Sequence, residues 1–223
     1  MAINRIRQHV NPLSRKFQRS IEIPQWQEIY AKPNHFLHLD IGCARGKFLL
    51  EMAQIAPNTN FLGIEIRQTL VIAANSEKEQ LGLTNLHYLF GNINYSASQL
   101  LASLPVNSLK YITVQFPDPW FKRKHQKRRV IQPELVDLLV DYLIDSGTVF
   151  LQSDIQEVAV EMRNRFALHP GLVQQHSETW LDKNPFPIAT ERELYVLKDN
   201  LPVYRVLFKK EKFKELFSKN IDV

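Results

Sequence analysis

From position 36 onward, short apolar segments alternate with longer amphipathic segments, and this alternation constrains the fold more than any other feature of the chain. Short apolar runs rich in β-branched and aromatic residues predict strands, whereas longer segments with apolar positions three and four apart predict helices. A chain in which strands and helices alternate forms a parallel sheet with helices on both faces. We therefore predict an α/β protein.

The predicted elements cover most of the chain. Strands are expected at 35–41, 60–65, 86–90, 111–115, 148–151, 172–176 and 203–208, and helices at 47–56, 69–81, 98–104, 133–143 and 155–166. Residues 1–34 contain three prolines and little periodicity, so we expect a basic N-terminal arm that is irregular or mobile. Residues 35–223 are enough for a single domain with one sizeable core.

The positive charge of the chain is concentrated in two segments. Residues 1–20 carry five Lys and Arg and no acid, and residues 116–129 carry six Lys and Arg and one acid. A local basic excess is typical of proteins that bind nucleic acids, although most charge runs are only solvated segments. The aromatic residues within 116–129 favour the nucleic-acid interpretation.

Cysteine content and hydropathy exclude several classes of protein. Cys43 is the one cysteine, so we expect neither an intramolecular disulfide nor a metal site of the Cys-rich kind. No apolar run approaches membrane-spanning length, and the polar, basic start is followed by no apolar signal region. We therefore expect a cytoplasmic protein with no membrane partner.

A glycine-containing turn, Leu-Asp-Ile-Gly-Cys-Ala-Arg-Gly at 39–46, joins the first predicted strand to the first predicted helix. Gly42 and Gly46 allow a tight turn and close approach of a ligand. Glu65, at the end of the second strand, can accept hydrogen bonds from both hydroxyls of an adenosine ribose.

Dinucleotides, nucleoside triphosphates and S-adenosylmethionine all bind at such turns. The motif spacing excludes a P-loop and disfavours a dinucleotide. Asp40 would repel a pyrophosphate but suits the amine and sulfonium of S-adenosylmethionine, unless it merely caps the turn.

Two further polar positions follow predicted strands. Asn92 can donate to an adenine ring nitrogen and accept from the exocyclic amine, although an ordinary turn Asn gives the same pattern. Asp118 lies between two prolines and beside Trp120, directly before the basic run. A rigid acidic and aromatic corner next to dense positive charge suits a site that holds a base and grips phosphates. The alternative is a rigid loop whose Trp belongs to the core.

Five motifs occur here in one order: Asp-Ile-Gly-x-x-x-Gly at 40–46, Gly-Ile-Glu-Ile-Arg at 63–67, Phe-Pro-Asp-Pro-Trp-Phe-Lys at 116–122, Lys-Arg-Arg at 127–129 and Thr-Glu-Arg-Glu at 190–193. Together they resemble the tRNA (guanine-N7)-methyltransferase family, which methylates the variable-loop guanine of tRNA. The resemblance covers nearly the whole chain from about Arg5. The Phe-Pro-Asp-Pro-Trp motif with its basic tail is highly specific, whereas the glycine turn is not.

This resemblance implies a class I methyltransferase fold, in which a seven-stranded, mostly parallel, Rossmann-like sheet has an antiparallel last strand and helices on both faces. It implies S-adenosylmethionine as the cofactor and tRNA as the partner. Separately, we expect a monomer or a homodimer, although the sequence itself does not distinguish these from a protein that acts with a second subunit. The family pattern carries two departures here, because Asn92 replaces the Asp of some members and Ala44 lies in the middle of the glycine turn.

The resemblance also implies residue roles. The cofactor-binding positions fall on Asp40, Gly42, Gly46, Glu65, Asn92 and Asp118, and Asp118 is also the catalytic or base-gripping acid. The substrate-binding positions fall on Lys122, Lys124, Lys127, Arg128, Arg129, Asp154, Thr190 and Glu193. Arg5, Arg7 and His9 are expected to meet tRNA or the cofactor rim. From the residues alone, Asp154 fits equally well as an acid that stabilises a helix N-terminus. The Thr190-x-x-Glu193 pattern likewise fits a capping box, with no contact to a substrate.

Methylation of guanine N7 makes modest chemical demands, because N7 carries a lone pair and no proton. The protein has to align the reacting atoms in a water-poor pocket rather than supply a general base at N7. Asp118 can accept from guanine N1–H and the exocyclic amine and so offset the developing positive charge. Two other functions stay open: methylation of an exocyclic amine, and RNA binding without catalysis. The presence of Asp40, Glu65 and Asp118 together disfavours the second.

Overall fold

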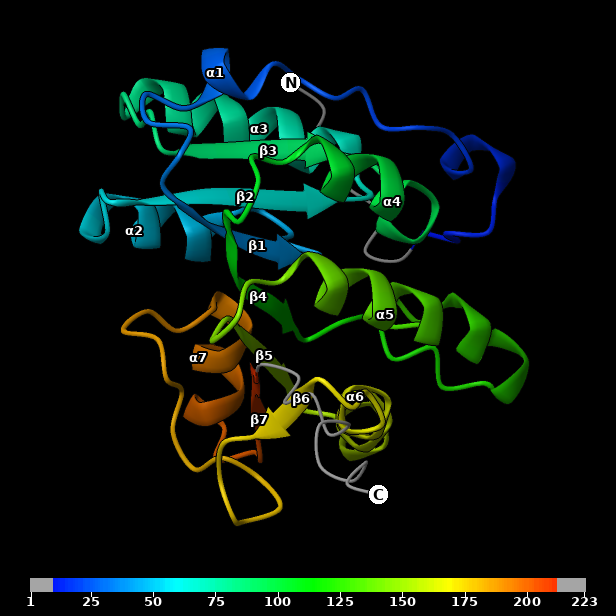
Figure 1. Cartoon of the computed structure of the whole chain (residues 1–223). Helices are drawn as coiled ribbons and strands as arrows, with labels where there is room; N and C mark the ends of the chain where they lie inside the picture. Colours follow the sequence, from blue (N-terminus) through cyan, green and yellow to red (C-terminus); the bar gives the residue numbers. More distant parts are fainter. Residues whose placement is uncertain (1–9, 212–223) are drawn as a thin grey trace, which may run out of the picture.

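The computed structural model describes residues 10–211, in which seven strands form one sheet in the order β3-β2-β1-β4-β5-β7-β6 (Figure 1). The strands are β1 (Phe36–Ile41), β2 (Thr59–Glu65), β3 (Leu86–Phe90), β4 (Leu109–Gln115), β5 (Thr148–Ser153), β6 (Leu172–Gln174) and β7 (Tyr204–Lys210). Strands β1 to β5 pair in parallel, whereas β7 runs antiparallel to both β5 and β6. The predicted fold class is confirmed.

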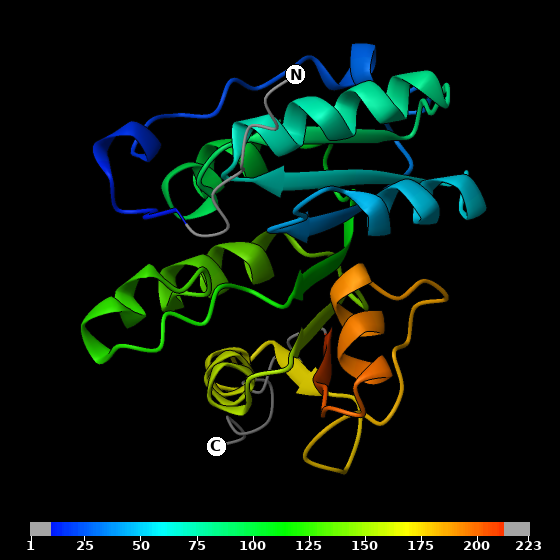
Figure 2. The ribbon, with the colours of Figure 1, turned by 180° about the vertical axis from the view of Figure 1, so that it is seen from behind.

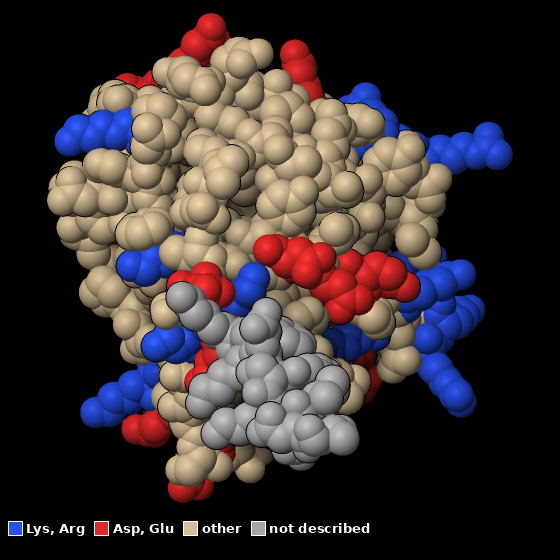
Figure 3. Space-filling model, in the orientation of Figure 1, with Lys and Arg blue, Asp and Glu red and all other residues tan. Residues whose placement is uncertain are grey.

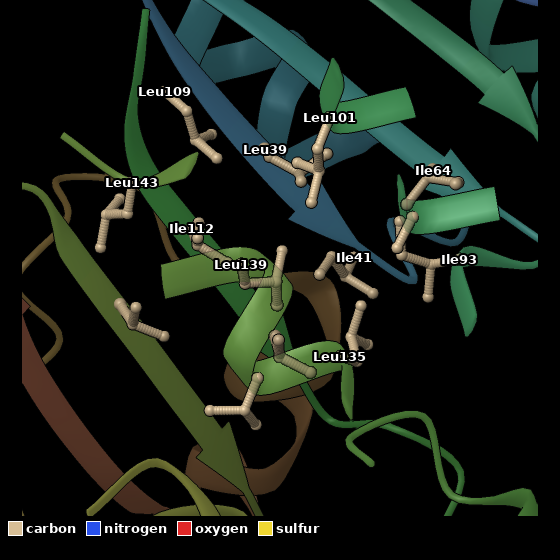
Figure 4. Close-up of a cluster of buried hydrophobic side chains, with 14 of the residues drawn as sticks. Leu39, Ile41, Ile64, Ile93, Leu101, Leu109, Ile112, Leu135, Leu139 and Leu143 are labelled. Carbon is tan, nitrogen blue, oxygen red and sulfur yellow. The ribbon is translucent and has the colours of Figure 1, made fainter. Parts of the chain in front are cut away.

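Helices cover both faces of the sheet. They are α1 (Trp26–Ile29), α2 (Lys47–Ile55), α3 (Gln68–Gln80), α4 (Ile93–Ser103), α5 (Pro133–Tyr142), α6 (Gln156–Ala167) and α7 (Glu191–Lys198), with 3-10 turns η1 (Arg15–Phe17) and η2 (Arg123–Arg128). Helices α4, α5 and α6 pack on one face, where they share a large apolar cluster with β1, β2, β4 and β5 (Figure 4). Helices α2 and α3 cover the other face with a second cluster, as Figure 2 shows from behind. Among the described residues, no helix has the length and apolarity needed to cross a membrane.

Three helices differ from the sequence predictions, and one of them, α1, lies in the N-terminal segment where no helix was expected. Helix α4 begins at Ile93 rather than at 98, because Asn92 lies before it and accepts a hydrogen bond from the backbone N of Asn94 at 3.2 Å. Such an N-cap satisfies a backbone donor that the first turn leaves free. Helix α7 was indicated only by its capping-box pattern, and the side chain of Thr190 does accept from the backbone N of Glu193 at 3.1 Å.

The described part of the N-terminal segment packs against the sheet and α4. Ile21, Trp26 and Tyr30 are at most 4% exposed and belong to the larger apolar cluster. The indole N–H of Trp26 donates to the hydroxyl of Ser103 at 3.2 Å, and the hydroxyl of Tyr30 donates to the carbonyl of Phe61 at 3.0 Å. This segment therefore contributes to the core although it is mostly irregular.

We predict that Trp26→Ala lowers the free energy of unfolding by about 3–5 kcal/mol, because it leaves a cavity where a buried indole packs. Urea denaturation followed by circular dichroism measures the change. Val106→Ala is the matched control, since Val106 is 89% exposed and should change stability by less than about 0.5 kcal/mol. An unchanged stability of Trp26→Ala would contradict the placement of this segment in the core.

Candidate functional site

A cavity of about 920 Å³ opens at the carboxyl ends of β1, β2, β3, β4 and β5. In parallel α/β sheets this edge is where ligands bind. Of the residues predicted for the site, Asp40, Gly42, Glu65, Asn92, Asp118, Arg128, Asp154 and Thr190 line the cavity. The other predicted residues within the described range, Gly46, Lys122, Lys124, Lys127, Arg129 and Glu193, lie outside its lining. Arg5, Arg7 and His9 lie outside the residues that the structure describes.

The glycine turn depends on left-handed backbone conformations. Gly42 and Gly46 have φ values of 81° and 74°, and a Cβ at Gly46 would lie 2.5 Å from the ring of Tyr88. The Tyr88 hydroxyl donates to the carbonyl of Gly46 at 2.6 Å. Gly46 therefore shapes the turn through close packing, while Gly42 faces the cavity. Ala44 also adopts a left-handed φ of 51°, which glycine tolerates better.

Asp40 is a buried carboxylate at the cavity wall. It is 4% exposed, and its Oδ1 accepts hydrogen bonds from the Thr113 hydroxyl at 2.6 Å and from the Gln115 amide at 3.4 Å. Burial raises the pKa of Asp40 to about 6, and the two hydrogen bonds oppose this rise. A positively charged ligand group would favour the ionised form of this carboxyl group.

Glu65 is buried to a similar extent and is already hydrogen-bonded through both oxygens. Its Oε1 accepts from the backbone N of Arg67 at 2.9 Å and from Arg67 Nε at 2.8 Å. Its Oε2 accepts from Arg67 Nη2 and from the backbone N of Ala44, both at 3.0 Å. The planar guanidinium thus spans the two oxygens. A ligand diol that bonds both oxygens from this side has to displace the Arg67 side chain.

Asn92 contributes to the rim of the cavity. Its Oδ1 caps α4, and its Nδ2 donates to the carbonyl of Pro12 at 3.0 Å. Pro12 and Val10 also line the cavity. The Asn92 amide therefore ties the N-terminal segment to the loop after β3.

The Phe-Pro-Asp-Pro-Trp corner follows β4 and is held rigidly. Phe116 and Trp120, at its two ends, have left-handed φ values of 49° and 44°, and the prolines between them have fixed φ and no N–H. Between these ends, Asp118 lines the cavity. The fixed backbone limits the directions in which its carboxylate can point.

Arg129 anchors this corner. It is 5% exposed, and its Nε donates to the carbonyl of Pro119 at 2.7 Å. Its Nη2 donates to Glu157 on α6 at 2.7 Å, and its Nη1 pairs with Glu161 on the same helix. Because two carboxylates already neutralise this guanidinium, we infer that Arg129 positions the corner instead of binding a phosphate.

The other cations of the run have different surroundings. The guanidinium carbon of Arg128 lies 4.9 Å from the centroid of the Trp120 ring, so Arg128 and Trp120 form one wall of the cavity. Lys122, Lys124 and Lys127 are exposed. Figure 3 shows Lys and Arg along the right-hand edge of the molecule, at the end that holds η1 and η2 in Figure 1. This edge has the positive charge that a polyanion requires.

The last part of the lining comes from the two helix starts beyond β5. Asp154 precedes α6 and pairs with Arg192 of α7, and Thr190 caps α7. Glu193 completes only half of a capping box, because its carboxylate is buried and bonds Arg205 at 2.8 Å and Gln152 at 3.0 Å. Both interpretations of Asp154 and Thr190 therefore stay compatible with the structure.

Sequence reasoning missed Arg67, Thr113, Gln115 and Gln152. Thr113 and Gln115 lie two positions apart in a strand, so their side chains leave the same face of the sheet. Polar residues at alternate positions of an otherwise apolar strand were the available signal. Among the described residues, no group of three or more His, Cys, Asp or Glu could hold a metal ion.

Comparisons with known proteins show which proteins this chain is similar to. A family model described as a putative methyltransferase matches residues 34–206. A curated tRNA (guanine-N(7)-)-methyltransferase from Microcystis aeruginosa is 56% identical over 209 residues, which cover 94% of this chain and 99% of the relative. A protein of the same name from Nostoc sp. is 55% identical over 206 residues, which cover 92% of this chain and 94% of the relative.

Solved structures support the fold. The 30S ribosomal A1408 methyltransferase from an uncultured bacterium matches with a TM-score of 0.54 and 18% identity, over 86% of this chain and 97% of that chain. The 16S rRNA methyltransferase KamB matches with a TM-score of 0.54 and 15% identity, over 86% and 95% of the two chains. At this level of identity the likeness concerns the arrangement of strands and helices alone.

Proposed function

This chain belongs to the tRNA (guanine-N(7)-)-methyltransferase family, and we propose that it methylates N7 of the variable-loop guanine of tRNA, with S-adenosylmethionine as the methyl donor. The observation that carries the proposal is that one cavity collects Asp40 from the end of β1, Glu65 from the end of β2 and Asp118 from the corner after β4. The proposal includes a cytoplasmic location, in keeping with the tRNA substrate in the relatives' name, and activity as a monomer or a homodimer.

The residues on the β1 and β2 side of the cavity fit the proposed cofactor. Two buried carboxylates lie beside a turn that brings backbone close to the ligand. Asp40 would hold the positively charged amine, and Glu65 would hold the ribose hydroxyls once the Arg67 guanidinium turns away. Asn92 would contact the adenine from the rim. When bound, S-adenosylmethionine supplies a methyl group activated by its sulfonium.

The residues on the β4 side of the cavity fit the guanine. Asp118 would accept from guanine N1–H and the exocyclic amine, which holds the edge opposite N7 and offsets the positive charge that develops on the purine. Trp120 and Arg128 form an adjoining wall, which limits the orientations of the base and excludes water. Asp154, Thr190 and Arg192 close the remaining side.

We predict that Asp118→Asn lowers the rate of methyl transfer by about 100- to 1,000-fold, because a preorganised charge that acts in the transition state is lost. The rate is measured with labelled S-adenosylmethionine and bulk tRNA. Calorimetry should give a dissociation constant for S-adenosylhomocysteine within about threefold of wild type, because the proposal assigns the Asp118 carboxylate to the guanine; a larger rise would instead support the cofactor-binding role expected from the family resemblance. The control is Asp137→Asn, at an exposed position outside the cavity lining. Full activity of Asp118→Asn would remove Asp118 from the mechanism.

The same assay with wild-type protein tests the proposed function. The modified nucleoside should make the tRNA sensitive to cleavage by borohydride and aniline, as methylation at N7 does. Methyl groups on N2 or N6 would instead establish an exocyclic-amine methyltransferase. Binding of tRNA without any methyl transfer would establish an RNA-binding module.

The raised pKa of Asp40 predicts a pH dependence of cofactor binding. The empty protein holds a proton on Asp40 below about pH 6, so the ammonium group of the ligand must compete with that proton. Affinity for S-adenosylhomocysteine should therefore reach a plateau near neutral pH, where the ligand amine is still protonated, and fall below about pH 6, approaching tenfold per pH unit. Calorimetry across this range measures the effect.

The matched variant for this pH dependence is Asp40→Asn. It should bind S-adenosylhomocysteine more weakly and show a flat profile, because the titrating group is gone. A profile that still bends near pH 6 in Asp40→Asn would assign the titration to another residue.

We further predict that the double variant Lys124→Ala, Lys127→Ala makes the negative slope of log affinity for tRNA against log salt concentration shallower by about 1.5, because each lost phosphate contact removes about 0.7–0.9 from its magnitude. Arg129→Met is the matched comparison. It should leave the slope unchanged but lower the free energy of unfolding by about 1.5–3 kcal/mol, since hydrogen bonds to charged groups are lost. Filter binding and urea denaturation measure the two quantities, and a reduced slope in Arg129→Met would reject its anchoring role.

A further inference from the structure

A row of buried polar side chains crosses three neighbouring strands beneath the cavity. Gln115 on β4 is in register with Gln152 on β5, and Gln152 is in register with Arg205 on β7. Each of the three is at most 9% exposed. Gln115 lines the cavity, whereas Gln152 and Arg205 lie outside its lining. The row therefore leads from the floor of the site toward the far edge of the sheet.

Glu193 lies at the far end of this row and is 1% exposed. Its Oε1 accepts from Arg205 Nε at 3.1 Å and from Nη2 at 2.8 Å. Its Oε2 accepts from Gln152 Nε2 at 3.0 Å and from Asn184 Nδ2 at 2.7 Å. An ionised carboxylate has about four acceptor positions, and these four bonds fill them. Glu193 has no acceptor position left for a substrate.

The charge of Glu193 sets the direction of the two amides in the row. Because a carboxylate only accepts, Gln152 must turn its nitrogen toward Glu193, and the same nitrogen donates to Gln115 Oε1 at 2.8 Å. Gln115 must then present its own nitrogen to Asp40 Oδ1, at 3.4 Å. Among the described residues, Gln152 Oε1 has no hydrogen-bond partner, as expected when both available acceptors require the nitrogen.

We propose that Glu193 is a positioning residue for the cofactor, which acts through Gln152 and Gln115 on Asp40 and does not touch the substrate. Its charge orders the amides so that Gln115 donates to Asp40 and holds that carboxylate in place. The inference rests on the proposed use of Asp40 for the amine of the cofactor. Independently of its charge, Glu193 also donates its backbone N–H to the hydroxyl of Thr190, which lines the cavity.

Two variants test the row. Glu193→Gln removes the charge, and Gln152→Met removes the middle amide while it leaves the bonds of Glu193 to Arg205 and Asn184. Both should raise the dissociation constant of S-adenosylhomocysteine roughly tenfold in calorimetry, the size expected for one hydrogen bond to a charged group. If Glu193→Gln fails to fold, Gln152→Met decides.

The control is Asn60→Leu, which removes a buried amide that donates to the Lys32 carbonyl at 2.9 Å near the start of β2. It should leave the affinity for S-adenosylhomocysteine unchanged. In an Asp40→Ala background, Gln152→Met should have no further effect, because the row then has no acceptor to hold.

The inference would be overturned if Gln152→Met bound S-adenosylhomocysteine as tightly as wild type does. It would also be overturned if Gln152→Met caused the same loss of affinity in the Asp40→Ala background as in the wild-type background. Wild-type protein that binds S-adenosylhomocysteine but methylates no tRNA would overturn the proposed function and leave this inference standing.

Discussion

The parallel pairing of β1 with β2 and β4 is the constraint on which the site depends. The register places Asp40 opposite Gly63 on one side and opposite Thr113 on the other. Because parallel strands end at the same edge of a sheet, the glycine turn, Glu65 and the Phe-Pro-Asp-Pro-Trp corner meet there despite their separation in the sequence. The same register supplies the Thr113 hydroxyl that bonds the buried carboxylate of Asp40, which offsets part of the cost of burying it.

Local patterns in the sequence predicted most of the strands and helices, because periodicity and turn residues act over a few positions. They misplaced the start of α4, since the capping role of Asn92 was not recognised. They also missed Arg67, Gln115 and Gln152. These polar side chains acquire partners only through strand register and tertiary contacts, and a single sequence does not reveal which strands will be neighbours.

The basic run shows the limit of arguments from composition. Its six cations look equivalent in the sequence, but the fold gives them different surroundings. Arg129 meets two carboxylates of α6, Arg128 covers the ring of Trp120, and Lys124 and Lys127 stay exposed. The acids that single out Arg129 come from a later helix. The charge of a segment is therefore readable from sequence, whereas the use of each charge depends on distant residues.

The pairing of Glu65 with Arg67 has a consequence for inhibitor chemistry. A compound with a ribose-like diol must separate a carboxylate and a guanidinium that bond through two parallel contacts, and this separation subtracts from its affinity. A compound that engages only Asp40 and the corner leaves the pair intact. The same pair therefore sets a free-energy cost on binding a diol that a ligand without sugar hydroxyls does not meet.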